Sequence, residues 1–319
     1  MSFSGNIKEE ISRQLSPARH CQIAELAAII SMCGAVMIDS RGHAALKIHT
    51  ENLAVARKRF TLLRRTFNIV VDIAIRVNRE KGSSYYYIVV KKHEDAIRVL
   101  QAAKLLNPYG DVEEELSVVK NVVIQETCCK RSFLRGVFLA SGSMSDPEKS
   151  YHFEIVCASM GKAQQIQKIM RCFALDAKIV SRKKSFVVYL KEGAQIVDVL
   201  NVMEAHQSLM ELENIRILKD MRNTVNRKVN CETANINKTV SAAVKQIDDI
   251  RYIEETKGLD KLPEGLKDMA LTRLTYPEAS LKELGALLQN PVGKSGVNHR
   301  LRKLSEMAEE IRAKQGGTL

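Results

Sequence analysis

Two similar apolar segments, 108 residues apart, constrain the fold of this chain more than any other feature. The first is Leu26–Gly34 and the second is Leu134–Gly142. In a helix, Gly136 and Ala140 would lie on one side, so a second helix could approach with its backbone almost in contact. Small residues recur at matching places: Ala28 with Gly136, Cys33 with Ser141, and Gly34 with Gly142. Two unrelated buried helices that each end at a glycine would also explain these segments.

The sequence after each segment repeats one order of elements, which favours a duplication. After Gly34 we predict strands at 35–38, 43–49, 69–77 and 85–91, and helices at 51–67 and 94–105. After Gly142 we predict strands at 151–157, 177–180 and 185–190, and helices at 162–173 and 193–203. The strands rest on alternating polarity and the helices on a period of about 3.6 residues. An α-ββ-α-ββ-α order at a fixed offset indicates two repeats, 20–105 and 128–205.

The paired segments resemble the central helices of LAGLIDADG homing endonucleases, which pack between two saddle-shaped sheets. In that family the eighth position of the motif carries the catalytic, metal-binding aspartate. Here Cys33 and Ser141 occupy this position, and a thiol and a hydroxyl cannot bind a hard divalent cation as paired carboxylates do. Asp39 and Asp146 fall in or near predicted turns, where aspartate is common for local reasons. The resemblance therefore implies the scaffold without its nuclease chemistry, and we expect no enzyme and no catalytic residue.

Composition gives weaker guidance about partners. The net charge of +12 favours a polyanion, although many basic proteins bind none. The seven cysteines include no Cys-x-x-Cys, and adjacent Cys128-Cys129 suits neither a simple disulfide nor a zinc site. None of the seven histidines stands at metal-ligand spacing from cysteines along the sequence. We expect reduced thiols, no metal, no cofactor and no small-molecule substrate.

Neither the start of the chain nor its most apolar run indicates a membrane protein. Residues 1–15 are amphipathic rather than a signal peptide. The run Ile23–Ile38 contains Glu25 and is shorter than the roughly 20 residues that a membrane span needs. We expect a cytoplasmic, nucleoid-associated protein with no membrane partner.

The last sixty residues carry the second strong pattern, three short helices. Pro263 stands at the start of the first, which runs to about Leu274. Ser280 and Glu283 form an S-x-x-E capping box for a second helix, 281–288. After a break at 289–293, a third helix begins at Lys294 with three apolar residues on one face: Val297, Leu301 and Leu304. Its outward residues are Ser295, Asn298, His299, Arg302 and Lys303.

This arrangement resembles the helix-turn-helix of bacterial sigma factors. Leu284-Gly285 matches the usual apolar-small pair and Val297 the inward residue of the reading helix, although the turn is about two residues longer than the commonest form. A generic three-helix packing domain is the alternative. Arg, Lys and Asn on the outer face suit contacts to base edges and phosphates in the major groove. Within 279–312 the expected DNA-binding residues are Lys282, Lys294, Ser295, Asn298, His299, Arg300, Arg302 and Lys303.

Two other basic stretches could contact phosphates or could be solvated surfaces. The predicted helix at 53–67 contains five basic residues and no acid: Arg57, Lys58, Arg59, Arg64 and Arg65. A helical connector at 206–257, predicted to break near 230–233 and to end in a hinge at 257–260, adds Arg222, Arg227, Lys228 and Lys238. The predicted domains are therefore 1–205, 206–257 and 258–319, an α+β fold followed by an all-α module.

Taken together, the chain resembles the WhiA family of bacterial regulators over nearly its whole length. The matching strings are 128–136, 222–227, 230–235 and 294–303. The resemblance implies a sequence-specific regulator of transcription that binds double-stranded DNA and acts in cell division and chromosome segregation, and in sporulation among actinobacterial relatives. Two alternatives stay open. The saddle could hold another transcription regulator or RNA polymerase, or unrecognised acids could form a metal-dependent nuclease.

Overall fold

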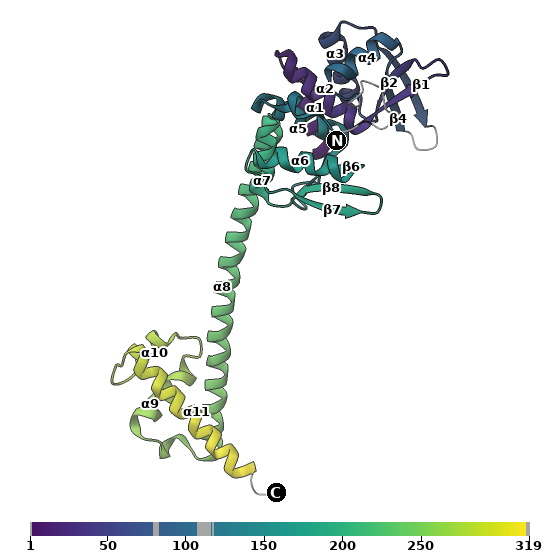
Figure 1. The fold of residues 1–319 in the computed structure, drawn as a ribbon. Helices are drawn as coiled ribbons and strands as arrows, with labels where there is room; N and C mark the ends of the chain where they lie inside the picture. Colours follow the sequence, from purple (N-terminus) through teal and green to yellow (C-terminus); the bar gives the residue numbers. More distant parts are fainter. Residues whose placement is uncertain (1, 79–82, 107–115, 117, 317–319) are drawn as a thin grey trace. The chain divides into compact units, whose positions relative to one another are not determined.

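The computed structural model describes residues 2–78, 83–106, 116 and 118–316, and their contacts divide the chain into two units, 1–219 and 220–319 (Figure 1). The predicted duplication is confirmed in the first unit. Its first repeat contains α2 (Arg19–Cys33), β1 (Gly34–Ile38), β2 (Ala44–Thr50), α3 (Leu53–Phe67), β3 (Asp72–Asn78), β4 (Ser83–Val90) and α4 (His93–Ala102). The second contains α5 (Thr127–Ser141), β5 (Gly142–Met144), β6 (Phe153–Cys157), α6 (Met160–Arg171), β7 (Lys178–Arg182), β8 (Ser185–Leu190) and α7 (Gly193–Val202). Helix α1 (Phe3–Arg13) precedes the first repeat, and the 3₁₀ helix η1 (Asn121–Ile124) precedes the second.

The two sheets have the same antiparallel topology. The strand orders are β1-β2-β4-β3 and β5-β6-β8-β7, with Leu46 opposite Val90 in the first sheet and Ile155 opposite Val188 in the second. These four side chains are buried, because alternate residues of each strand point to the same face. Helices α3 and α4 pack on the first sheet and α6 packs on the second.

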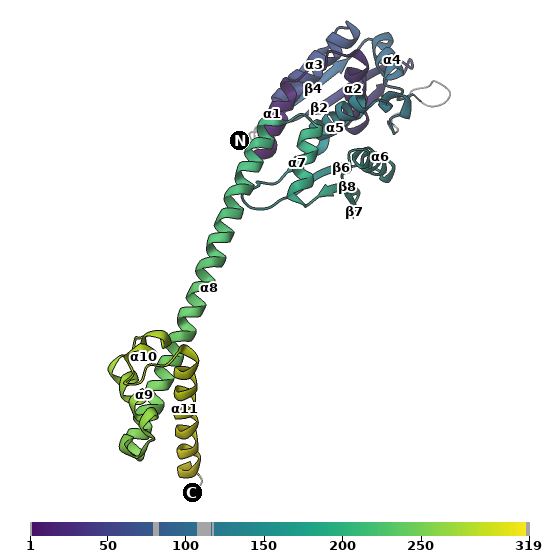
Figure 2. The ribbon, with the colours of Figure 1, turned by 90° about the vertical axis from the view of Figure 1, so that its left-hand side faces the viewer.

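Helices α2 and α5 form the centre of the first unit (Figures 1 and 2). Each has 15 residues, and their bounds differ by the predicted 108 residues. Both are apolar on most sides, as expected for helices that are covered all round. A Cβ atom on Gly136 would lie 2.5 Å from the Glu25 carbonyl oxygen and 2.8 Å from the Ala28 Cβ. Only glycine at 136 therefore allows the two backbones to come this close.

Helix α8 (His206–Thr256) is one continuous helix of 51 residues, so the predicted break near 230–233 is wrong. The asparagines and threonine there are weak helix formers, but the helix contains neither glycine nor proline, the residues that interrupt helices strongly. Near its start Leu212 joins the core of the first unit, and near its end Ile250 and Ile253 join that of the second. The helix ends just before Gly258, whose positive φ lies at the predicted hinge. The contacts divide the chain at residue 219, within α8, and do not test the predicted domain limits at 205 and 257.

The second unit is helical, as predicted. It contains η2 (Leu259–Lys261), α9 (Glu264–Thr275), α10 (Leu281–Leu287) and α11 (Lys294–Gly316). Helix α11 is longer than predicted, and its last turns lie beside the end of α8, with Lys245 Nζ 3.1 Å from Glu309 Oε1 and Arg312 Nη1 2.7 Å from Asp249 Oδ1 (Figure 2). In the described part of the chain, no helix is long and apolar enough to cross a membrane.

Candidate nucleic-acid interface

Helix α10 begins with the predicted capping box. The Glu283 amide donates to Ser280 Oγ at 3.4 Å, and the Ser280 amide donates to Glu283 Oε2 at 2.8 Å. These bonds favour the carboxylate and lower the pKa of Glu283. The reciprocal cap fixes the start of α10, which is the helix before the predicted reading helix.

The close approach of α10 to the following turn requires the small residue predicted at 285. A Cβ atom on Gly285 would collide with the carbonyl oxygen of Val292 and would lie 3.1 Å from Val297 Cγ2. The Val292 amide donates to the Gly285 carbonyl at 3.1 Å, which closes the connection between α10 and α11. The longer turn inferred from the sequence is therefore held by a backbone hydrogen bond.

Helix α11 places one face in the core and leaves the other in solvent. Val297, Leu301 and Leu304 are at most 1% exposed, as predicted. The five residues predicted to face outward are all exposed: Ser295, Asn298, His299, Arg302 and Lys303. All five come from the first half of the helix. They form a polar, partly basic surface that no other part of the described unit covers.

The three remaining expected contacts differ in availability. Lys282 and Lys294 are exposed, whereas Arg300 is half-buried and its guanidinium lies against Gly265 of α9. Arg302 is exposed, but its Nε donates to Glu306 Oε1 at 2.8 Å, one turn along α11. An exposed pair of this kind costs little to open, so Arg302 is available to a stronger anionic partner.

Two of the five basic residues on α3 are buried, so the prediction of a phosphate-facing or solvated surface is wrong for them. Lys58 is 2% exposed, forms an ion pair with Glu25 and donates to the Ile11 carbonyl at 2.8 Å. Arg59 is fully buried and donates to the carbonyls of His49 at 2.6 Å and Leu139 at 3.3 Å. Helical spacing from Val55, Leu62 and Leu63 was the sequence signal for their inward direction.

The other auxiliary residues are accessible. Arg57, Arg64 and Arg65 are exposed on α3. Exposed positions on α8 are occupied by Arg222, Arg227, Lys228 and Lys238. The structure therefore leaves seven basic residues of the original auxiliary set free to meet phosphates, and removes two.

The position of the endonuclease metal site does not suit a hard divalent cation. Cys33 and Ser141 end α2 and α5, and the Cys33 thiol donates to the Ile29 carbonyl at 3.2 Å. The Arg59 guanidinium and the Lys8 ammonium lie near this thiol, while burial raises the pKa of Cys33. Two positive groups beside a protonated thiol would repel Mg²⁺ rather than bind it. The residues present thus do not fit the nuclease metal.

Family models, relatives and a solved structure that are similar to this chain carry the name WhiA. Three family models match: the WhiA N-terminal LAGLIDADG-like domain at residues 19–106, the WhiA LAGLIDADG-like domain at 130–222 and the WhiA C-terminal HTH domain at 225–308. A protein of Lachnoclostridium phytofermentans named "Probable cell division protein WhiA" is 55% identical over 98% of this chain and 100% of its own length. One of the same name from Alkaliphilus oremlandii is 48% identical over 98% of both chains. The crystal structure of full-length WhiA from Thermatoga maritima is similar at 27% identity and a TM-score of 0.60, covering 97% of this chain and 99% of that one.

Proposed function

Because this chain belongs to the WhiA family, we propose that it regulates transcription by binding a specific sequence in double-stranded DNA. The observation that carries the proposal is that α11 has one buried apolar face and one exposed polar face. Its inner residues, such as Val297 and Leu301, are buried, while Asn298 and Arg302 are exposed. A rigid helix of this kind can enter the major groove with its amide and guanidinium groups directed at base edges.

We propose cell division as the process that the regulation serves. Relatives that align over nearly the whole of this chain are named probable cell division proteins. Control of chromosome segregation, and of sporulation in actinobacterial relatives, is the finer form of this proposal. A protein with this role would reside on the nucleoid.

Basic residues outside the helix-turn-helix would add affinity without adding sequence preference. Arg57, Arg64 and Arg65 of α3 and the four α8 residues named above are exposed and carry charge that can neutralise phosphates. Each phosphate that they neutralise would steepen the plot of log affinity against log salt by about 0.9. The helix-turn-helix alone should therefore keep the preferred site and show a shallower salt dependence.

We propose that the protein does not cleave DNA. Cys33 and Ser141 replace the metal-binding carboxylates of the endonuclease motif, and Arg59 and Lys8 lie near Cys33. Incubation of supercoiled DNA with the protein and Mg²⁺ should leave it intact. Nicking that survives repurification and disappears in an acidic-residue variant would contradict this.

A second role, as a docking surface for another transcription regulator or RNA polymerase, is supported by β3. Ile73, Ile75 and Val77 on this edge strand of the first sheet are 49–62% exposed. Soluble proteins rarely expose contiguous apolar surface of this kind, and where they do it commonly marks a site that a partner covers. Ile75→Lys should abolish retention of such a partner and leave DNA binding unchanged. Equal retention by the variant would remove β3 from the proposal.

Selection of bound duplexes from a random library by the full-length protein tests the main proposal. We expect enrichment of one short sequence, and footprinting on that sequence should show protection in the major groove. Recovery of unrelated sequences with equal affinity would show that the protein binds DNA without reading it.

A further inference from the structure

Four metal-ligating side chains from distant parts of the sequence meet at one end of the central helix pair. His20 and Cys21 lie in the first turn of α2, and Cys128 and Cys129 lie in the first turn of α5. Their ligand nitrogen and sulfur atoms all lie within 4.8 Å of one another. We propose that this Cys₃His cluster binds one thiophilic divalent cation of the zinc class. The proposal replaces the expectation from the sequence that the protein holds no metal.

The duplication explains how the cluster arises. His20-Cys21 and Cys128-Cys129 are separated by the same 108 residues as the two apolar segments. Each repeat therefore contributes one adjacent pair from the equivalent position, and packing of α2 against α5 brings the pairs together. No pair has the spacing of a zinc motif along the sequence, so local spacing does not predict the site.

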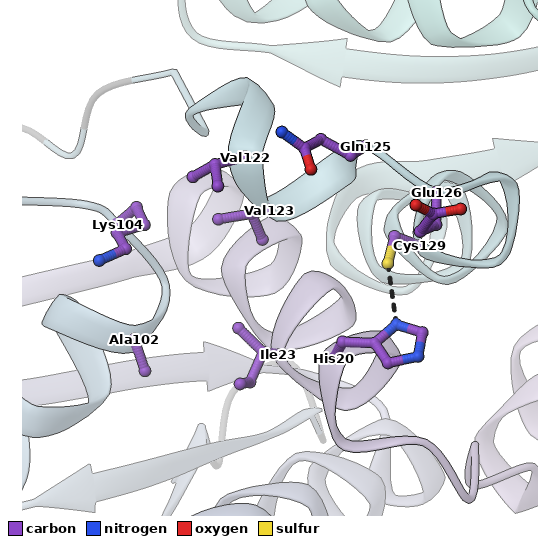
Figure 3. A pocket seen from close by; sticks show the side chains of 9 residues that line it. All are labelled: His20, Ile23, Ala102, Lys104, Val122, Val123, Gln125, Glu126 and Cys129. Carbon is purple, nitrogen blue, oxygen red and sulfur yellow. Dashed lines mark hydrogen bonds between the residues drawn. The ribbon is translucent and has the colours of Figure 1, made fainter.

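The geometry suits tetrahedral coordination. His20 Nδ1 lies 3.1 Å from Cys129 Sγ (Figure 3) and 3.5 Å from Cys21 Sγ. A zinc ion with Zn–S bonds of about 2.3 Å would hold neighbouring sulfurs about 3.8 Å apart. Contraction from 4.8 Å to this distance is about 1 Å, which rotation of the side chains can supply. A disulfide would use two of the four groups and leave the imidazole without a role, whereas metal binding uses all four.

Three sulfur ligands this close together suit a central positive charge. The three sulfur atoms and the imidazole nitrogen lie within 4.8 Å of one another, and thiolates this close repel each other. A cation between them reverses that repulsion. Ser16 and Ser132 line the cavity beside Cys21 and Cys128, where their hydroxyls are available as outer partners of the metal ligands. The N-terminal ends of two helices point the positive ends of their dipoles at the same place.

An ion can reach the cluster from either side. A cavity of about 330 Å³ is lined by His20 and Cys129 together with Glu126 (Figure 3). A second cavity, of about 300 Å³, is lined by Cys21 and Cys128. Arg135 also lines the second cavity, but its guanidinium lies 2.7 Å from Glu204 Oε2, so its charge is paired. Two of the four ligands are buried and held by packing, and the other two are exposed, so an ion from solvent can reach them.

A bound ion would tie the starts of α2 and α5 together and so hold the two repeats in register. Cys33 and Ser141, where the endonuclease metal would sit, lie at the opposite ends of these helices, about 18 Å away along each axis. The proposed site is therefore separate from the lost nuclease centre. It stands whether or not the protein binds DNA.

Cobalt substitution of the full-length, reduced protein tests the site. Titration with Co²⁺ should saturate at one ion per chain and give thiolate-to-metal charge-transfer bands with the intense visible bands of tetrahedral cobalt. Zn²⁺ should displace the cobalt and raise the melting temperature. X-ray absorption of the zinc form should show three sulfur ligands at about 2.3 Å and one nitrogen at about 2.0–2.1 Å.

Variants separate ligation from a structural role of the cysteines. Cys128→Ser changes an exposed side chain, so it should fold, and it should weaken Co²⁺ binding by more than the about 10–100-fold that loss of an outer partner costs. His20→Cys should retain tetrahedral binding with a stronger charge-transfer band. Cys231→Ser, an exposed cysteine on α8, is the control and should bind as the wild type does. Octahedral cobalt without thiolate bands, equal binding by Cys128→Ser, or a disulfide that consumes these thiols in place of metal would each overturn the proposal.

Discussion

Gly136→Ala tests the close contact at the centre of the duplicated domain. The added Cβ would lie 2.5 Å from the Glu25 carbonyl oxygen, a backbone atom that cannot rotate away, and 2.8 Å from the Ala28 Cβ. Overpacking a filled core costs about 1–3 kcal/mol, and the immovable carbonyl argues for the upper end. Alanine returns about 1 kcal/mol of helix propensity, so we expect a net loss of about 2 kcal/mol. For a domain of this size that loss lowers the melting temperature by about 4–8 °C.

Urea unfolding followed by circular dichroism measures this loss, and Gly161→Ala is the matched control. Among the described residues, a Cβ on Gly161, in the first turn of α6, would come close to the Val118 side chain alone, at 3.3 Å. The control should therefore be neutral or slightly stabilising. If Gly136→Ala matches the control, α2 and α5 are not in backbone contact, and our explanation of the paired small residues fails.

Three further predictions concern buried and exposed charges. Glu25→Gln leaves the buried Lys58 ammonium without its counter-charge and should reduce the free energy of unfolding by about 3–5 kcal/mol in urea titrations. An undiminished stability would show that Lys58 is neutral or hydrated. The capping box lowers the pKa of Glu283, so the ionised side chain stabilises the start of α10. This stabilisation should be complete at neutral pH and lost as the pH falls through the lowered pKa. The protection factor of the Ser280 amide, which is its exchange rate relative to that of an unstructured amide at the same pH, measures this loss. A protection factor that stays constant as the pH falls would contradict the prediction. Reversing Arg57, Arg64 and Arg65 to glutamate should reduce the salt slope of DNA binding by up to about 2.7 if each meets one phosphate. An unchanged slope would make α3 a solvated surface.

The duplicated architecture could be predicted because its signals are local. Strand alternation, helical periodicity and the fixed offset each need only a short window of sequence. The inward-facing side of α11 was predictable for the same reason, since Val297 and Leu301 are one helical turn apart. The capping box at Ser280 likewise needs only four residues.

Features that depend on tertiary contacts were missed. The charge of Arg59 predicts an exposed side chain, yet hydrogen bonds to the carbonyls of His49 and Leu139 make its burial possible. A break at 230–233 is predicted from the sequence, but weak helix formers there do not interrupt a long helix that lacks glycine and proline. His20 and Cys129 come together only when α2 packs on α5, so their cluster cannot be predicted from a short window of sequence.

The most direct test of the proposed function is the affinity of α11 variants for the selected DNA site and for a scrambled duplex at one salt concentration. Asn298→Ala and Arg302→Ala should each weaken the selected site by about 1–3 kcal/mol, or about 5- to 150-fold, and the scrambled duplex much less. Lys314→Ala, exposed on the same helix beyond the reading half, is the control and should change both little. Equal losses of affinity for the two duplexes would show that these residues contact phosphates rather than bases. No loss on either would remove α11 from the DNA interface and contradict the account.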